Sequence, residues 1–120
     1  MENSYQASNK KESRQISRKG EKMATSKEYH DYILENLQKV GDVRTRKMMG
    51  EYCVYFQGKV IGNICDNSLF LKPVDSALRM FPDAERAYPY EGSKTLMVVV
   101  DDVENVEKMT KLLHVMYGEL

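Results

Sequence analysis

The stretch RKMMGEYCVYFQGK, from Arg46 to Lys59, decides the fold. Aromatic and β-branched residues dominate Tyr52 to Phe56, and Gln57-Gly58 separates them from a second run of the same kind. This arrangement predicts a β-hairpin with a two-residue turn. Gly50 permits a bend or bulge before the hairpin. We therefore expect the following side chains to pack in a sheet: Met48, Tyr52, Val54 and Phe56.

Further strands are predicted on both sides of this hairpin. Side chains alternate between the two faces of a strand, so Arg44 and Arg46 share one face of the strand that precedes it. A turn at Asp66-Asn67-Ser68 leads into the last strand of the group. Four strands joined by tight turns indicate an antiparallel meander. The predicted strands are Val43 to Met49, Tyr52 to Phe56, Lys59 to Cys65 and Leu69 to Lys72.

Helices are predicted before and after the meander. Thr25-Ser26-Lys27-Glu28 has the spacing of a capping box, and the apolar periodicity behind it predicts a helix from Ser26 to Val40. Asp75 is expected to cap a short helix from Ser76 to Phe81. Asp101-Asp102-Val103-Glu104 is expected to cap a last amphipathic helix. The apolar stripe of that helix consists of Val106, Met109, Leu113, Met116 and Tyr117.

Two segments lie between the short helix and the last one. Pro82 to Lys94 is predicted to be an irregular loop, and the continuous apolar run Leu96 to Val100 the central, most buried strand. The order is therefore α-β4-α-β-α. We predict an α+β, two-layer fold in which an antiparallel sheet of about five strands carries helices on one face.

Charge is distributed unevenly along the chain, although 18 Lys and Arg balance 18 Asp and Glu. Residues 1–22 hold six basic and three acidic side chains, so the remainder has a net charge of −3. A mildly acidic body argues against nucleic-acid binding by the domain itself, because phosphate contacts need clustered Lys and Arg. No apolar run is long enough for a membrane span or a secretory signal, and we expect a cytoplasmic protein.

The boundary of the folded domain is predicted near Met23. Residues 1–22 are too polar to offset the entropy of ordering them, whereas residues 23–120 form one domain without an internal linker. Lys19 to Met23 can be back-translated as AAA GGA GAA AAA ATG, a ribosome-binding sequence before a start codon. Two readings stay open: a disordered basic tail, or a mis-called leader with translation starting at Met23.

The cysteines and histidines do not predict catalysis. In the expected hairpin Cys53 faces Gly62 rather than Cys65, which argues against a disulfide. Nothing in the sequence places His30 or His114 beside a thiol as a base. No spacing typical of metal ligands is present, and helix capping accounts for Asp101-Asp102. We therefore expect no enzyme, no metal site and no cofactor.

Exposed basic and aromatic side chains are the remaining candidates for a site. Arg44, Arg46 and Lys47 form a basic strand that either binds a partner or keeps a sheet edge soluble. Lys72 is expected on a neighbouring strand. The loop YPYEGSK presents Tyr88 and Tyr90 beside a glycine. The predicted partner-binding residues are Arg44, Arg46, Lys47, Lys72, Tyr88 and Tyr90.

A family resemblance rests on the hairpin and the strand after it. RKMMGEY, from Arg46 to Tyr52, then Gly58-Lys59 and Leu69-Phe70-Leu71-Lys72 resemble the N-terminal domain of the TfoX/Sxy family of bacterial competence regulators. Pro89 to Gly92 is similar to the branch of small single-domain members. Met49 replaces a common Phe, and Glu51 replaces a second Gly. The matching motif positions, all structural in kind, are Arg46, Met48, Met49, Gly50, Tyr55, Gly58, Leu71 and Lys72.

The resemblance implies a fold akin to secretion-chaperone-like domains and brings no catalytic residues or cofactor. Longer members carry a second, helical domain and are regarded as co-activators that work with the cAMP receptor protein at competence promoters. It therefore implies a non-enzymatic module for protein–protein contact in transcription regulation, with a partner such as a regulator of the cAMP-receptor-protein type. Three alternatives stay open: direct nucleic-acid binding through residues 1–22 and the strand 44–47, a small-molecule-binding role, and a homodimer.

Overall fold

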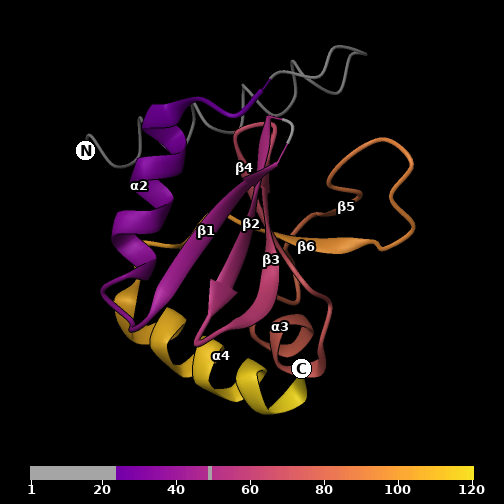
Figure 1. The fold of residues 1–120 in the computed structure, drawn as a ribbon. Helices are drawn as coiled ribbons and strands as arrows, with labels where there is room; N and C mark the ends of the chain where they lie inside the picture. The colour runs from indigo at the N-terminus through magenta and orange to yellow at the C-terminus, as the bar shows by residue number, and fades with distance from the viewer. Residues whose placement is uncertain (1–23, 49) are drawn as a thin grey trace, which may run out of the picture.

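The structure is a computed structural model that describes residues 24–48 and 50–120. Its strands form a single antiparallel sheet in the order β1-β2-β3-β4-β6-β5 (Figure 1). The first four strands are the predicted meander, and the fold is α+β. The strands are β1 Val43–Met48, β2 Glu51–Phe56, β3 Lys59–Cys65, β4 Ser68–Leu71, β5 Arg86–Ala87 and β6 Met97–Val100.

Within the described residues, three helices pack against one face of the sheet: α2 Lys27–Leu37, α3 Asp75–Met80 and α4 Val106–Glu119. In Figure 1, α2 lies beside β1, and α4 runs below the ends of the strands next to α3. Together these elements enclose the main core, because each contributes apolar side chains with little or no exposed surface. That core includes Ile33 and Leu37 of α2, Ala77 of α3, Met109, Leu112 and Leu113 of α4, and Val54, Phe56, Leu69, Leu71, Val98 and Val100 of the sheet.

The other face of the sheet, called the open face below, carries none of the described helices. Strand pairing places Phe70 opposite Val99, and both side chains belong to a second, smaller buried cluster with Cys65 and Met97. Because β4 and β6 bury residues on both faces, Leu69 to Leu71 and Met97 to Val100 are continuous apolar runs in the sequence. Every residue of β4 and of β6 is buried.

The turns between strands have the backbone that two-residue hairpins need. Gln57 and Gly58 both have positive φ, as do Asp66 and Asn67 in the next turn, which is the type I′ signature. Gly50 also has positive φ and belongs to the turn between β1 and β2, where Met48 pairs with Glu51. It is thus a turn residue rather than a bulge. Its neighbour Met49, part of the family motif, lies outside the described residues.

Helix caps differ from the prediction at three places. Ser26, not Thr25, caps α2 by accepting a hydrogen bond from the Tyr29 amide, while the Thr25 hydroxyl accepts one from the Asn67 amide. Asp75 is the first residue of α3 rather than its cap. Asn105 caps α4 by accepting from the Lys108 amide, so Asp101 and Asp102 are free of that role.

Three other predictions need correction in the sheet. The expected loop from Pro82 to Lys94 contains the short strand β5, which raises the strand count to six. β6 is as buried as predicted but lies next to the β5 edge rather than in the centre, and Leu96 lies outside it with 45% exposed. Met48 is 46% exposed, since it points to the open face at the end of an edge strand.

The start of the chain is not covered by the structure. Residues 1–23, with the predicted tail and the proposed start at Met23, lie outside the described residues. None of the helices in the described part of the chain is both long and apolar enough to cross a membrane.

Candidate functional site

The open face brings several predicted site residues onto one surface. Arg44 pairs with Tyr55, and Arg46 pairs with Cys53, so both arginines point to this face as predicted. Both side chains are exposed. A row across the sheet follows from the register of the strands: Arg46, Cys53, Asn63, Phe70 and Val99.

The three cations of β1 are not equivalent. The Arg44 Nε lies 3.0 Å from the Asp42 Oδ1, and the arginine side chain is 80% exposed, so this ion pair is screened by water. Arg46 forms no ion pair with a described residue. Lys47 pairs with Tyr52, whose ring stacks on His30 of α2 at 4.0 Å between ring centroids. Lys47 therefore points to the face with the helices and is separated from the two arginines.

A second group of predicted residues lies at the far side of the open face. The Lys72 amide donates to the Ile61 carbonyl, and alternation from Phe70 places the Lys72 side chain on the open face. Lys72 and Tyr90 both line a hollow of about 380 Å³. Tyr88 is 56% exposed but does not line it. The remaining lining residues are Asn63, Pro73, Val74, Pro89, Ser93, Thr95 and Met97.

The two groups do not form one compact pocket. Strands β2 and β3 separate β1 from β4, which corresponds to roughly 14 Å at the usual strand spacing. Tyr55 and Asn63 lie between them, half-buried. The open face therefore has the form of a contact surface, with two arginines along one edge and a lysine and a tyrosine at the other side.

Neither cysteine is part of a disulfide and both are buried, as expected of structural thiols. The register differs from the prediction by one residue, because a bulge between Val54 and Tyr55 pairs Cys53 with Asn63 instead of Gly62. The Cys65 Sγ donates to the Glu51 Oε1 at 3.0 Å. No histidine adjoins either thiol among the described residues, so the open face offers no activated Cys nucleophile there.

One hydrogen-bonded array was not anticipated from the sequence. The His30 Nε2 lies 2.8 Å from the Thr45 Oγ1, and the His30 Nδ1 lies 2.9 Å from the Asp31 Oδ1. This hydroxyl–imidazole–carboxylate order resembles a nucleophile, base and orienting group. However, Asp31 is exposed and shared with Lys27, whose ammonium is the main cause of the lowered pKa of that carboxyl. The array joins α2 to β1 through the His30–Thr45 contact, and His30 lines none of the hollows described here.

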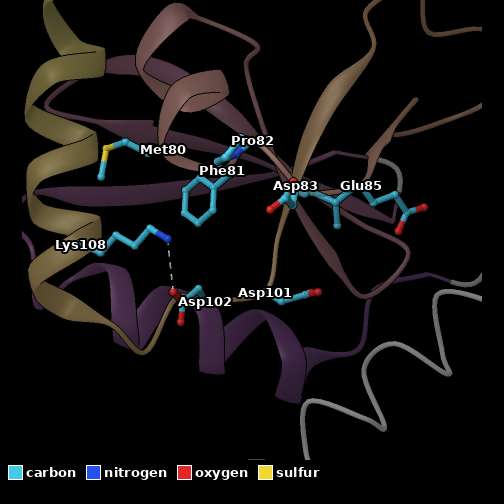
Figure 2. A pocket seen from close by; sticks show the side chains of 10 residues that line it. Met80, Phe81, Pro82, Asp83, Glu85, Asp101, Asp102 and Lys108 are labelled. Carbon is cyan, nitrogen blue, oxygen red and sulfur yellow. Dashed lines mark ion pairs between the residues drawn. The ribbon is translucent and has the colours of Figure 1, made fainter.

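A hollow of about 490 Å³ opens between the end of α3, β6 and the start of α4 (Figure 2). Its size falls in the range of small-molecule sites. Four carboxylates and one ammonium line it: Asp83, Glu85, Asp101, Asp102 and Lys108.

The lysine in this hollow already has partners. Lys108 Nζ lies 3.8 Å from the Asp102 Oδ2 and 4.3 Å from the centre of the Phe81 ring (Figure 2). In the described part of the chain, no group of three or more His, Cys, Asp and Glu is arranged to hold a metal ion. No sequence pattern predicted this hollow, because its residues come from three separate segments.

Comparisons with known proteins point to one family. A model of the TfoX N-terminal domain matches residues 35–113, which include the whole sheet and most of α4. The chain is also 37% identical over 93 residues to an uncharacterized 12.7 kDa protein in the trpE 5' region of Spirochaeta aurantia. That alignment covers 78% of this chain and 81% of the relative. No solved structure matches the chain.

Proposed function

Because the chain belongs to the TfoX N-terminal domain family, we propose that it is a non-enzymatic regulatory module that acts by protein–protein contact in transcription. Its partner is part of the transcription machinery, such as a regulator of the cAMP-receptor-protein type, and the protein works in the cytoplasm. The competence role that the sequence resemblance implies is the setting for this contact.

The open face is the observation that carries the proposal. Arg44 and Arg46 lie exposed at one side of this face, and Lys72 and Tyr90 lie at the other. Arginine and tyrosine are enriched in protein interfaces, because each combines a large contact area with a directed polar group. A face that none of the described helices covers, and that carries such residues around a buried apolar cluster, suits a protein partner better than a small ligand.

A charge reversal on the open face tests the proposal. Partners are first recovered by affinity purification from the native organism, and their binding to the purified chain is then measured. Arg46→Glu is expected to weaken binding at least about tenfold, because it reverses the charge of an exposed arginine on the proposed contact surface. Arg79→Glu is the matched control, since Arg79 is also exposed but lies on α3. Equal binding of every partner by wild type and Arg46→Glu would contradict the proposal.

Direct nucleic-acid binding is the second candidate, and one observation favours it. Arg44, Arg46 and Lys47 lie exposed within four residues of an edge strand. This candidate requires an affinity for duplex DNA that falls steeply with salt, because phosphate contacts release counterions. A gel-retardation assay at low salt distinguishes the two candidates, since no retardation would leave only the protein partner.

A further inference from the structure

β1 is an edge strand, so one side of its backbone faces no other strand of the described residues. Among the described residues it pairs only with β2, at the end of the strand order. In an antiparallel pair, alternate residues direct their amide and carbonyl groups toward the partner strand or away from it. An exposed edge of this kind is a template for another extended chain.

Hydrogen bonds at Val43 identify which residues point outward. The Val43 amide donates to the Gly41 carbonyl, and the Val43 carbonyl accepts from the Gln38 Nε2 at 3.1 Å. Both groups of Val43 are therefore directed away from β2. Because the direction alternates, Thr45 and Lys47 also direct their amides and carbonyls outward, while Arg44 and Arg46 bond to β2.

The outward groups of Thr45 and Lys47 remain available within the described chain. Gln38 binds the outer edge at Val43, so the outward carbonyl of Val43 already has a partner. His30 binds the hydroxyl of Thr45 on the face with the helices, so that side chain lies away from the outer edge. Two residues thus offer two amides and two carbonyls at the spacing of a strand.

Charge along this edge indicates what can bind there. Arg44 and Arg46 flank Thr45 on the open face, and Lys47 lies on the other face. Two copies of β1 side by side would bring these cations together, which disfavours a second copy of this chain. An acidic strand would instead place a carboxylate beside each arginine.

We propose that the outer edge of β1 binds an extended acidic segment of a partner protein as an added strand. Its backbone pairs with Thr45 and Lys47, and acidic side chains at alternate positions lie beside Arg44 and Arg46. This mode of recognition derives affinity from backbone hydrogen bonds and specificity from side chains. The inference rests on the proposed protein–protein function and names the chemistry of the partner.

A synthetic peptide provides the first test. The probe is a heptapeptide that alternates Glu and Val, acetylated and amidated at its ends, titrated into ¹⁵N-labelled protein. We expect saturable shifts and slowed hydrogen exchange at the Thr45 and Lys47 amides, weakened by salt. Two matched peptides separate charge from strand pairing: one has Lys in place of Glu, and the other is N-methylated at every Val. Neither is expected to bind, because one repels the edge and the other lacks the paired amides.

A pair of variants at Thr45 provides the second test. Thr45→Pro removes the outward amide without removing a bond to β2, and proline is tolerated at such edge positions. Thr45→Val removes the same hydroxyl but keeps the amide, so it controls for the lost contact with His30. Thr45→Pro is expected to bind the Glu-Val peptide about tenfold more weakly than Thr45→Val.

The outcomes separate this inference from the proposed function. Binding of the N-methylated peptide as tightly as its parent would overturn strand pairing, and this result does not depend on how any variant folds. Peptide-induced shifts confined to the open face would overturn it as well. If Thr45→Pro keeps the native partner while Arg46→Glu loses it, the protein–protein function stands and only the edge mode fails. If both variants keep the partner, both proposals fail.

Discussion

Gly62 lies in β3 opposite Leu71 of β4. A Cβ at this position would overlap the carbonyl oxygen of Phe70 and press on the Cα of Leu71. These are backbone atoms in a close-packed interior, so a whole strand must shift to make room. Gly62→Ala is therefore expected to lower the free energy of unfolding by about 3 kcal/mol. Urea denaturation measures the effect.

Gly118 supplies the matched control for this residue. It lies in α4, and a Cβ added there meets nothing within 4 Å. Gly118→Ala is expected to raise the free energy of unfolding by up to about 1 kcal/mol, because alanine has the higher helix propensity. If the two alanine variants are equally stable, the close approach of β3 and β4 at Gly62 is wrong.

Single residues also decided where prediction from the sequence succeeded and where it failed. Gln57-Gly58 was predicted as a turn and is confirmed, since few residues other than glycine favour the positive φ that this turn requires. The bulge at Val54 has no comparable signature, so the sequence placed Cys53 one residue out of register. The sequence alone did not show why a glycine is needed at position 62, because the atoms that leave no room for a side chain there belong to β4.

At the scale of elements, Tyr32 ties α2 to the segment before α4. Its hydroxyl donates to the Glu104 Oε2 at 2.6 Å. Partial burial, and next the nearby Glu104 carboxylate, raise the pKa of Tyr32 well above its ordinary value of 10.0. A raised pKa in the folded state means that its contribution to stability is fully present below about pH 10 and is lost as the pH rises further.

Tyr32→Phe tests this link between elements. We expect the free energy of unfolding to fall by about 1 kcal/mol at neutral pH, because one hydrogen bond is lost. Above pH 10 the variant should lose stability less steeply than wild type, so the difference between them narrows. Urea unfolding at a series of alkaline pH values measures both effects, with Tyr55→Phe as the control on the open face. Parallel pH curves for Tyr32→Phe and wild type would refute the assignment.

Elements with a strong local pattern were predictable, and those set by their neighbours were not. α2 and the strands from β1 to β4 follow their periodicity to within a few residues. β5 has only two residues and exists because it pairs with β6. The observed caps of α2 and α4 lie one residue or more from the predicted ones, because several neighbouring Ser, Thr, Asp and Asn side chains can each serve as a cap.

For the whole molecule, the sequence predicted which residues are exposed better than it predicted which residues lie close together in space. Arg44 and Arg46 were expected to share a face, and they do, because alternation along a strand is a local rule. That Lys72 and Tyr90 line one hollow depends on the order of strands and the path of a loop. Alternation along the strand also separates Lys47 from the two arginines. That Lys47 points to the face covered by the helices became clear only from the position of α2.

The charges of β1 also affect whether the protein self-associates. A free edge with outward groups at Thr45 and Lys47 would pair with itself unless the side chains prevent it, and like charges in opposed strands do so. The triple variant Arg44→Thr, Arg46→Thr, Lys47→Thr keeps strand propensity and removes the repulsion. We expect it to self-associate at protein concentrations roughly tenfold lower than wild type, since each opposed like-charge pair costs a few tenths to about 1 kcal/mol.

Sedimentation velocity over a range of protein concentrations measures this self-association. Adding Thr45→Pro to the triple variant should restore wild-type behaviour, because proline removes an outward amide that an added copy needs. High salt should move wild type toward the triple variant by screening the cations. A triple variant that sediments like wild type at every concentration would mean that something other than charge prevents the edge of β1 from pairing with another copy. In that case the edge of β1 would not be open to an acidic strand either, so the same measurement bears on both.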